Sequence, residues 1–255
     1  MTDRRGGTVV AAARRTEDGS AGALPAGGRP GALPDGVGAG TLPAQIHELL
    51  EGAIIHGVLE PGRRLHTDKL AAQYGVSRIP VREALRSLHE AGWVDIRPRY
   101  GVYVRERSEE ELQQLFEARA MIEAGIAGWA AERHRTADLR TLRTVVSASE
   151  KAARRGDVEA LDRLGGEFYA ALRTAAGNDV AAALAANLEK RAKFYFSMVA
   201  GDLGADWVSV HRELLTLVAA RDRAGAEALS RHHILDTGRA VGELLAAQTE
   251  PGPPG

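Results

Sequence analysis

The sequence contains no cysteine among its 255 residues. This absence excludes disulfide bonds, thiolate catalysis and cysteine-ligated metal sites, and it fits a reducing compartment. Long hydrophobic runs are also missing, since the stretch from Val180 to Leu188 is too short and too rich in alanine to span a bilayer. The first residues carry no compact apolar segment of the signal-peptide type. We therefore expect a cytoplasmic protein without a membrane partner.

The chain also lacks an excess of charge of either sign, because its formal net charge is −1. Binding to a nucleic acid would therefore depend on a local basic patch. Charged residues make up 26% and hydrophobic residues 44% of the chain, which is ordinary for a globular protein. The length allows one large domain or two small domains with proper cores.

The N-terminal segment is rich in glycine and proline and poor in large apolar side chains. Such a segment cannot bury enough surface to offset the entropy of ordering it, so we expect a disordered tail over 1–41 and a second over 249–255. Its arginines could contact DNA phosphates, but the acidic residues among them favour a solvated tail.

The stretch from Thr67 to Ala91 has the pattern of two helices joined by a tight turn. Gly75 is expected to end the first helix, Ser77 to cap the second, and Pro80 to lie in its first turn. The second helix has an apolar face of Val81, Ala84, Leu85 and Leu88 and a neighbouring polar face of Arg78, Arg82, Arg86 and His89. This layout is typical of a helix-turn-helix DNA reader, although a basic stripe can also be a solvated face.

After Gly92 the hydrophobic period changes from about four to two, which predicts a β-hairpin. Its strands would be 93–96 and 102–104, with a basic tip over 97–101 that could lie along the DNA backbone or in the minor groove. A hairpin that only closes the core is compatible with this, because Val94, Ile96, Val102 and Val104 can pack while the tip stays free. With a helix over 42–56 and a short extended piece at 63–66, the pattern predicts a winged helix-turn-helix domain over 42–106.

From Ser108 onwards the periodicity predicts helices only. The predicted segments are 109–133, 137–155, 158–176, 179–199, 206–222 and 225–247. The expected breaks are Gly156, Gly177, Gly201, Gly204 and Gly225, the expected N-caps are Thr136, Asp157, Asn178 and Asp206, and Ser108 with Glu111 matches a capping box. The fold class is therefore mainly α: a winged helix-turn-helix with a small hairpin wing, then an all-α bundle of six to seven helices over 108–248.

The string Gly-Val-Ser-Arg-Ile-Pro-Val-Arg-Glu-Ala-Leu at 75–85 and the string Gly-Val-Tyr-Val at 101–104 resemble the winged-helix domain of GntR-family bacterial transcription regulators. The helical half, with Arg119, Glu123 and Ala-Ala-Gly-Asn at 175–178, is similar to the FadR-like (FCD) branch. The resemblance covers about 42–247. It implies a homodimer on a pseudo-palindromic double-stranded DNA operator, and a small effector, often a carboxylic acid, in the bundle. We expect a ligand-responsive repressor associated with the nucleoid.

The resemblance also implies a set of DNA-binding residues. These are Ser77, Arg78, Arg82, Arg99, Tyr100 and Gly101, and the basic stripe of the second helix adds Arg86. Arg78 and Arg82 are one helical turn apart, so both can face the major groove, where arginine pairs with guanine. Where some relatives carry an arginine early in the preceding helix, this chain has Asp68 followed by Lys69, so a phosphate contact there would shift to Lys69.

Many members of this branch hold a divalent metal through Asp-x-x-x-His on the third bundle helix and a histidine on each of the last two. Here His211 and His233 match, whereas Gly165 and Tyr169 replace the first pair. Two neutral imidazoles without a carboxylate make a weak site, so a zinc-like ion is disfavoured and no cofactor is expected. We expect a metal-free effector site in which Arg119 anchors a carboxylate, with Tyr169, His211, His233 and any protonated histidine around it.

The sequence also allows other functions. The polar bundle residues could be packed core residues without a ligand, the bundle could retain a metal, or the protein could be an architectural DNA binder. The last is disfavoured because dimerisation alone needs less chain. No Ser/His/Asp arrangement, phosphate loop or full metal set indicates an enzyme. Gly165 and Gly166 inside a helix cost about 1–2 kcal/mol relative to alanine, which predicts either a close approach to a ligand or a helix break.

Overall fold

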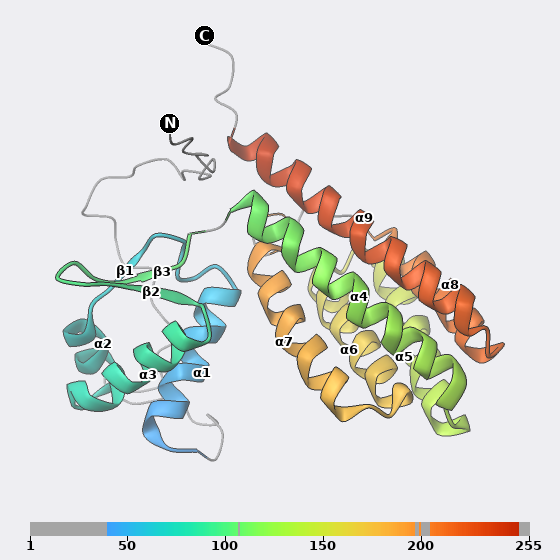
Figure 1. The fold of residues 1–255 in the computed structure, drawn as a ribbon, viewed down its shortest axis with the longest axis horizontal. Helices are drawn as coiled ribbons and strands as arrows, with labels where there is room; N and C mark the ends of the chain where they lie inside the picture. Colours follow the sequence, from blue (N-terminus) through green and yellow to red (C-terminus); the bar gives the residue numbers. More distant parts are fainter. Residues whose placement is uncertain (1–39, 107, 197–198, 200–204, 250–255) are drawn as a thin grey trace, which may run out of the picture. The chain divides into compact units, whose positions relative to one another are not determined.

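The computed structural model describes residues 40–106, 108–196, 199 and 205–249. The chain divides into two compact units, with the boundary between Ser108 and Glu109 (Figure 1). The predicted mainly α fold, with a winged helix-turn-helix followed by a helical bundle, is confirmed. The predicted tails fall almost wholly outside the described residues, as do Gly201 and Gly204.

The first unit is built from three helices and a small sheet. Its elements are α1 (Leu42–Ile55), β1 (Arg64–Leu65), α2 (Thr67–Tyr74), α3 (Arg78–Glu90), β2 (Val94–Arg97) and β3 (Gly101–Val104). The predicted hairpin is β2–β3, and the extended piece before α2 adds β1 as a third strand, in the order β1-β3-β2. Arg64 pairs with Tyr103 and Leu65 with Val102, both antiparallel. The wing is therefore tied to the segment that leads into the helix-turn-helix.

The core of the first unit lies between α1 and α3. The apolar face predicted for α3 is buried, α3 packs against α1, and Ile46, Leu50 and Ile54 of α1 are buried too. Gly75 ends α2 in the left-handed conformation, with φ 66°. Ser77 occupies the N-cap position of α3, but its side chain makes no capping hydrogen bond, so that prediction was wrong. Capping side chains bond the second or third helical N–H, and the third residue here is Pro80, which has none.

Burial decreases along the wing towards its tip. Val94 and Val104 form one cross-strand pair and are both buried. Ile96 pairs with Val102 nearer the tip and is 43% exposed, so the prediction that Ile96 packs was wrong. Val102 is half-buried. The hairpin therefore closes the core at its base and leaves its tip available to a partner.

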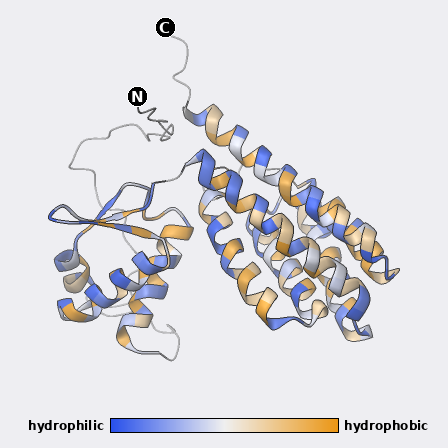
Figure 2. Cartoon of the chain, viewed as in Figure 1, coloured by the Kyte–Doolittle hydropathy of each residue, from blue (hydrophilic) through white to orange (hydrophobic). Residues whose placement is uncertain are grey.

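The second unit is a bundle of antiparallel helices (Figure 1). Its elements are α4 (Glu109–Arg133), α5 (Thr136–Arg155), α6 (Val158–Ala176), α7 (Asp179–Phe196), α8 (Trp207–Ala219) and α9 (Arg223–Thr249). Hydrophilic and hydrophobic residues alternate around these helices, as Figure 2 shows. None of the helices in the described part of the chain is long and apolar enough to cross a membrane.

Some of the helix caps and helix ends predicted for the bundle are found in the structure, and others are not. Asp157 accepts a hydrogen bond from the Ala160 amide and Asn178 from the Ala181 amide, so both predicted N-caps are confirmed. Gly156 and Gly177 end α5 and α6 as predicted. Thr136 is the first helical residue of α5, and the N-cap is Arg135. Asp206 precedes α8, as predicted for an N-cap, but its side chain makes no capping hydrogen bond. Its backbone already has helical angles, whereas a capping residue usually has an extended backbone.

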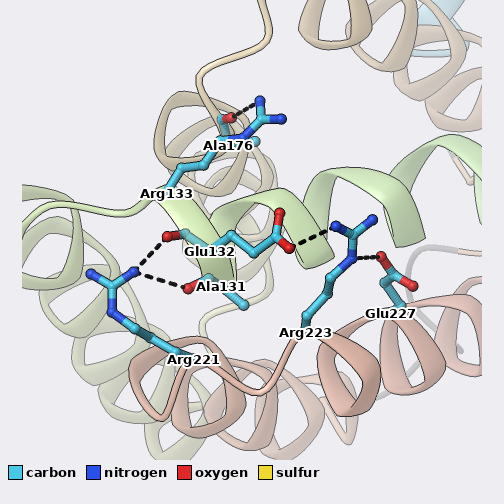
Figure 3. A network of polar contacts seen from close by, with 7 residues as sticks. All are labelled: Ala131, Glu132, Arg133, Ala176, Arg221, Arg223 and Glu227. Atoms are coloured by element: carbon cyan, nitrogen blue, oxygen red, sulfur yellow. Dashed lines mark hydrogen bonds and ion pairs between the residues drawn. The ribbon is translucent and has the colours of Figure 1, made fainter.

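The break between α8 and α9 is made by an arginine and not by Gly225, which lies inside α9. Arg221 has φ 58°, and its guanidinium donates to the carbonyl oxygens of Ala131 and Glu132 near the end of α4 (Figure 3). It also donates to the carbonyl oxygen of His134, the residue after α4. The last carbonyls of a helix have no partner within the helix, so this side chain satisfies them. Arg223 adds ion pairs of 2.7 Å to Glu132 and to Glu227 (Figure 3). The α8–α9 turn is thereby fixed to the end of α4.

Arg133, the last residue of α4, makes a second contact at this end of the bundle. Its guanidinium donates to the carbonyl oxygen of Ala176 at the end of α6, at 3.2 Å (Figure 3). The ends of α4 and α6 are therefore held together by a side chain that satisfies an unpaired terminal carbonyl.

Two glycines of α9 allow a stability test of the contact between α4 and α9. A Cβ at Gly238 would lie 2.6 Å from Cγ of Phe116 on α4, whereas a Cβ at Gly242 would lie 3.6 Å from Leu112, an ordinary contact. We expect Gly238→Ala to destabilise the protein by about 1–3 kcal/mol despite the better helix propensity of alanine. The matched change Gly242→Ala should be neutral or stabilise by up to about 1 kcal/mol. Urea unfolding followed by circular dichroism measures both, and equal stabilisation would contradict the close approach.

Candidate DNA-reading surface and effector site

The basic stripe of α3 is exposed, as predicted. Arg78, Arg82 and Arg86 are all exposed, while the opposite face of the helix is buried against α1. We call these three arginines the reading face. His89 is exposed as well, and its Nδ1 lies 2.9 Å from the carbonyl oxygen of Val94, which links the end of α3 to β2.

The arginines of the reading face differ in their partners. Asp68 of α2 pairs with Arg78, with 2.8 Å between Oδ1 and Nε. Glu90 pairs with Arg86 within α3, with 3.1 Å between Oε1 and Nε. Arg82 lies between them and has no ion-pair partner within residues 40–106. Within the described part of the first unit, no acidic side chain therefore competes with an external acceptor for its guanidinium.

The wing tip has a defined shape. Arg99 and Gly101 have left-handed backbone conformations, with φ 67° and 117°. The Tyr103 hydroxyl donates to the carbonyl oxygen of Tyr100 at 3.2 Å, and the Arg97 guanidinium lies 4.5 Å from the centre of the Tyr103 ring. Tyr100 itself is 70% exposed. The tip thus presents an exposed aromatic ring among cations and does not collapse onto the core.

Two arginines near this surface were not among the individually predicted DNA-binding residues, although Arg97 lies in the predicted basic tip. Arg64 and Arg97 flank the Tyr103 ring, and a Cβ at Gly101 would lie 3.1 Å from Arg64 Nε. Arg64 reaches Tyr103 because β1 joins the sheet beside β3. In the sequence, β1 was indicated only by a short extended piece, so this contact was not predicted. The predicted contacts Lys69 and Ser77 are both exposed.

The structure brings the four predicted effector residues together inside the bundle. The Arg119 guanidinium lies 6.0 Å from the Tyr169 ring centre, the Tyr169 ring 5.2 Å from that of His211, and the His211 ring 5.8 Å from that of His233. Arg119 is 3% and His211 2% exposed. These residues come from α4, α6, α8 and α9, and we call them the bundle cluster.

His211 is packed among aromatic rings. Its ring stacks on Phe168 with 3.9 Å between centres, and Trp207 contacts its edge at 4.7 Å. Neither aromatic partner was predicted as a site residue, although Phe168 precedes Tyr169 and Trp207 lies one turn before His211. Ligand entry next to His211 therefore requires at least one of these rings to move.

Burial controls the protonation of the bundle cluster. Burial, and then the neighbouring His233, lowers the pKa of His211 well below its usual value. Burial, and then the charge of Arg119, lowers the pKa of His233 to about 4. Burial raises the pKa of Tyr169, which stays a neutral phenol. Both histidines are neutral at neutral pH, so Arg119 supplies the positive charge here, and the expected contribution from a protonated histidine is dropped.

Several buried polar atoms in this region have no hydrogen-bond partner within the described residues. They are Arg119 Nε, Glu123 Oε2 and both ring nitrogens of His211. Glu123 lies 3.4 Å from Arg173, which also pairs with Glu189 at 2.6 Å. Buried polar groups are rarely left unpaired, so such a group of atoms indicates a place for a polar ligand or water.

The bundle cluster does not fit the divalent metal that the resemblance implies. A Cβ at Gly165 would lie 3.7 Å from the Trp207 ring, so the indole covers the position at which the resemblance implies a metal-binding aspartate. Among the described residues, no group of three or more His, Cys, Asp or Glu side chains could hold a metal ion. One buried and one half-buried imidazole beside a neutral phenol are a poor donor set. We therefore assign no role to a metal.

The pair Gly165–Gly166 does not break the helix, because α6 runs through both residues. The close approach at Gly165 is made by Trp207. Glu189 and Lys193 lie 3.3 Å from the Cβ position of Gly166. A surface recess of about 360 Å³ lies elsewhere, between α5 and α8, where Arg212 pairs with Glu150 at 3.3 Å. None of the four cluster residues lines it.

Two protein-family models match these two units. The model "Bacterial regulatory proteins, gntR family" matches residues 42–104, and the "FCD domain" model matches residues 114–236. The chain belongs to the GntR family and carries an FCD domain. The gntR model describes regulatory proteins. The family is thus one of regulators and not of enzymes, as the sequence predicted.

Relatives of this GntR-family protein are also transcription regulators. It is 31% identical over 147 residues to the HTH-type transcriptional regulator LutR of Bacillus subtilis, an alignment that covers 50% of this chain and 64% of LutR. It is 37% identical over 87 residues to the transcriptional repressor RspR of Escherichia coli, covering 34% and 38% of the two chains. The chain thus spans less than two thirds of the length of these relatives.

Solved structures show the same fold. Escherichia coli McbR/YncC superposes with a TM-score of 0.67 at 23% identity, covering 83% of this chain and all of that one. A GntR regulator from Rhodococcus sp. RHA1 gives a TM-score of 0.66 at 22% identity, covering 79% and 98%. At this identity the likeness supports the fold alone.

Proposed function

We propose that this GntR-family protein is a ligand-responsive repressor. In this proposal it binds a palindromic DNA operator as a homodimer and changes its affinity when a small anionic metabolite enters the bundle cluster. The observation that carries the proposal is that one chain combines an exposed reading face with a buried, incompletely paired polar cluster. A repressor is favoured because RspR, which is similar to this chain over 87 residues, is a transcriptional repressor.

The proposed DNA contacts follow from the geometry of α3 and the wing. Arg78 and Arg82 are one turn apart and exposed, so both can reach base edges when α3 lies in the major groove. Arg99, Tyr100 and Gly101 at the wing tip are placed for the backbone or the minor groove. Lys69, Ser77 and Arg86 would contact phosphates, which position the protein without reading sequence.

The proposed effector is an anion because of Arg119. This guanidinium is buried against the Phe116 and Tyr169 rings, and its Nε has no partner among the described residues. The nearby carboxylate of Glu123 already pairs with Arg173. A ligand carboxylate would give Arg119 a charge-assisted hydrogen bond, and the neutral His211, His233 and Tyr169 would bond its hydroxyl or carbonyl groups.

A switch requires that the ligand bind one arrangement of the protein better than another. The stacked His211 and Phe168 rings provide such a difference, because a ligand that displaces either ring shifts contacts of both α6 and α8. A ligand that bound without moving them would leave the bundle, and hence the DNA affinity, unchanged.

The test begins with the operator, selected from a random duplex library by the full-length protein. We expect a palindromic sequence, and we expect at least one member of a panel of small carboxylates to weaken operator binding about tenfold or more in fluorescence anisotropy. Arg119→Met should keep operator binding and lose the carboxylate response, because it retains the apolar stem and removes the charge.

Arg143→Met is the matched control, since Arg143 is an exposed arginine on α5, outside the bundle cluster. It should keep both binding and response. A full response in Arg119→Met would refute the effector site. Operator binding that no carboxylate alters would favour an architectural DNA binder, and a library without any enriched sequence would refute the regulator itself.

A further inference from the structure

An ion pair joins the two helices of the helix-turn-helix. Asp68, near the start of α2, lies 2.8 Å from Nε of Arg78, the first residue of α3. Both side chains are mostly exposed, at 67% and 71%. The pair therefore stands on the solvent side of the turn around Gly75, at the end of α3 that carries the first arginine of the reading face.

Stability alone does not explain this pair. An exposed ion pair contributes about 0–1 kcal/mol, and salt screens it further. A carboxylate beside a DNA-binding arginine also has a disadvantage, because it repels the phosphates that supply most non-specific affinity. A role in recognition accounts for a negative charge at this position better than a role in folding does.

We propose that Asp68 is a positioning residue that holds Arg78 in the orientation needed to read a guanine. This inference rests on the proposed function, in which α3 lies in the major groove. Asp68 contacts Nε, whereas the two terminal amino groups of the guanidinium are on the edge that can donate to O6 and N7 of guanine. An arginine held before binding loses less rotamer entropy when it meets its base.

The same carboxylate raises specificity in a second way. In non-specific complexes it opposes attraction to the phosphate backbone, so it weakens binding to every sequence. In the operator complex, Asp68 remains paired with Arg78 and its contribution to orientation offsets the repulsion. The ratio of specific to non-specific affinity therefore increases, even where operator affinity itself does not.

The pair between Arg86 and Glu90 provides the contrast. It joins residues four apart on α3 itself, so it moves with the helix and fixes nothing relative to α2. Glu90→Gln removes the same charge from the same surface and leaves Asp68 in place. It is the matched control for Asp68→Asn.

The probes are a duplex of about 30 base pairs with the selected operator, its single-base variants, and a shuffled duplex of equal length. Arg78→Ala first identifies the base pair whose preference depends on Arg78. At that position, Asp68→Asn should lower the preference for guanine about fivefold, and it should tighten binding to the shuffled duplex about threefold. Asp68→Glu should restore most of the preference, whereas Glu90→Gln should leave it unchanged.

A double-mutant cycle separates orientation from general charge. In the Arg78→Ala background, Asp68→Asn should still tighten non-specific binding but should change no base preference. If the wild type prefers its operator and Asp68→Asn keeps every preference, the inference fails while the proposed function stands. Equal weakening at all positions would also contradict it, since that indicates a damaged domain. A wild type without any sequence preference would overturn the proposed function and this inference together.

Discussion

Replacing Arg82 with alanine is expected to weaken operator binding by about 1–3 kcal/mol and to relax the base preference at one position in each half-site. Arg82 lies one turn after Arg78 on the exposed side of α3, and the described part of the first unit supplies no ion-pair partner for it. Its charge is therefore not offset before binding, and its loss removes a complete bidentate contact with a base.

Arg86→Ala is the matched control for this change. It removes the same group from the same helix, one turn further along, where Glu90 already partly neutralises the charge. We expect it to weaken specific and non-specific binding by a similar small factor and to reduce the slope of log affinity against log salt by about 1. Base preferences should stay as in the wild type.

The measurement is fluorescence anisotropy on the operator, its single-base variants and a shuffled duplex at several salt concentrations. Circular dichroism of both variants checks that the first unit remains folded. Arg82 is exposed and its removal leaves the buried face of α3 intact, so no loss of fold is expected. Unchanged base preference in Arg82→Ala would show that α3 is not the reading helix.

The first unit was largely predictable because its signals are local. Gly75 can adopt a left-handed conformation that other residues avoid, and the apolar period of α3 places Val81 and Leu85 on one side. The Ser77 side chain makes no cap, and Pro80 removes one of the two N–H groups that its hydroxyl could bond. The exposure of Ile96 depended on how far the sheet extends beyond its core, which strand periodicity alone does not determine.

The bundle cluster shows where prediction from the sequence stops. The resemblance implied one site for Arg119, Tyr169, His211 and His233, and these side chains do lie close together. Contacts between helices were not accessible, because they depend on the rotation and spacing of elements far apart in the chain. Trp207 covering Gly165 and the pairing of Asp68 with Arg78 are both of this kind.

The turn before α9 shows the same limit. Gly225 is the residue type that ends helices, but Arg221 takes the left-handed conformation because its guanidinium bonds the end of α4. Strain of about 1–3 kcal/mol at a non-glycine residue is tolerated where tertiary contacts offset it. The sequence signal for the turn was therefore overridden by contacts with a helix about 90 residues earlier.

The histidines of the bundle cluster should make stability depend on pH in the acid range. Burial and Arg119 lower the pKa of His233 from 6.5 to about 4 in the folded protein, and His211 is lowered as well. Asp236 partly offsets this at His233, while the neighbouring His232 adds to it. The unfolded chain therefore binds protons that the folded chain excludes. The stabilisation is fully present above about pH 6.5 and is lost as the pH falls towards 4, below which the contribution of His233 levels off.

Between about pH 7.5 and pH 5, His233 alone should account for a loss of about 2 kcal/mol in the free energy of unfolding. Urea unfolding at each pH measures the loss, and His233→Gln should reduce it by that amount, because glutamine does not titrate. Carboxylates elsewhere titrate equally in both proteins and cancel in the comparison. His232→Gln is the matched control, since His232 is an exposed neighbour on α9, and it should keep most of the wild-type dependence. An identical pH dependence in His233→Gln and the wild type would mean that His233 is solvated, and the bundle cluster would then be an open polar pocket instead of a packed one.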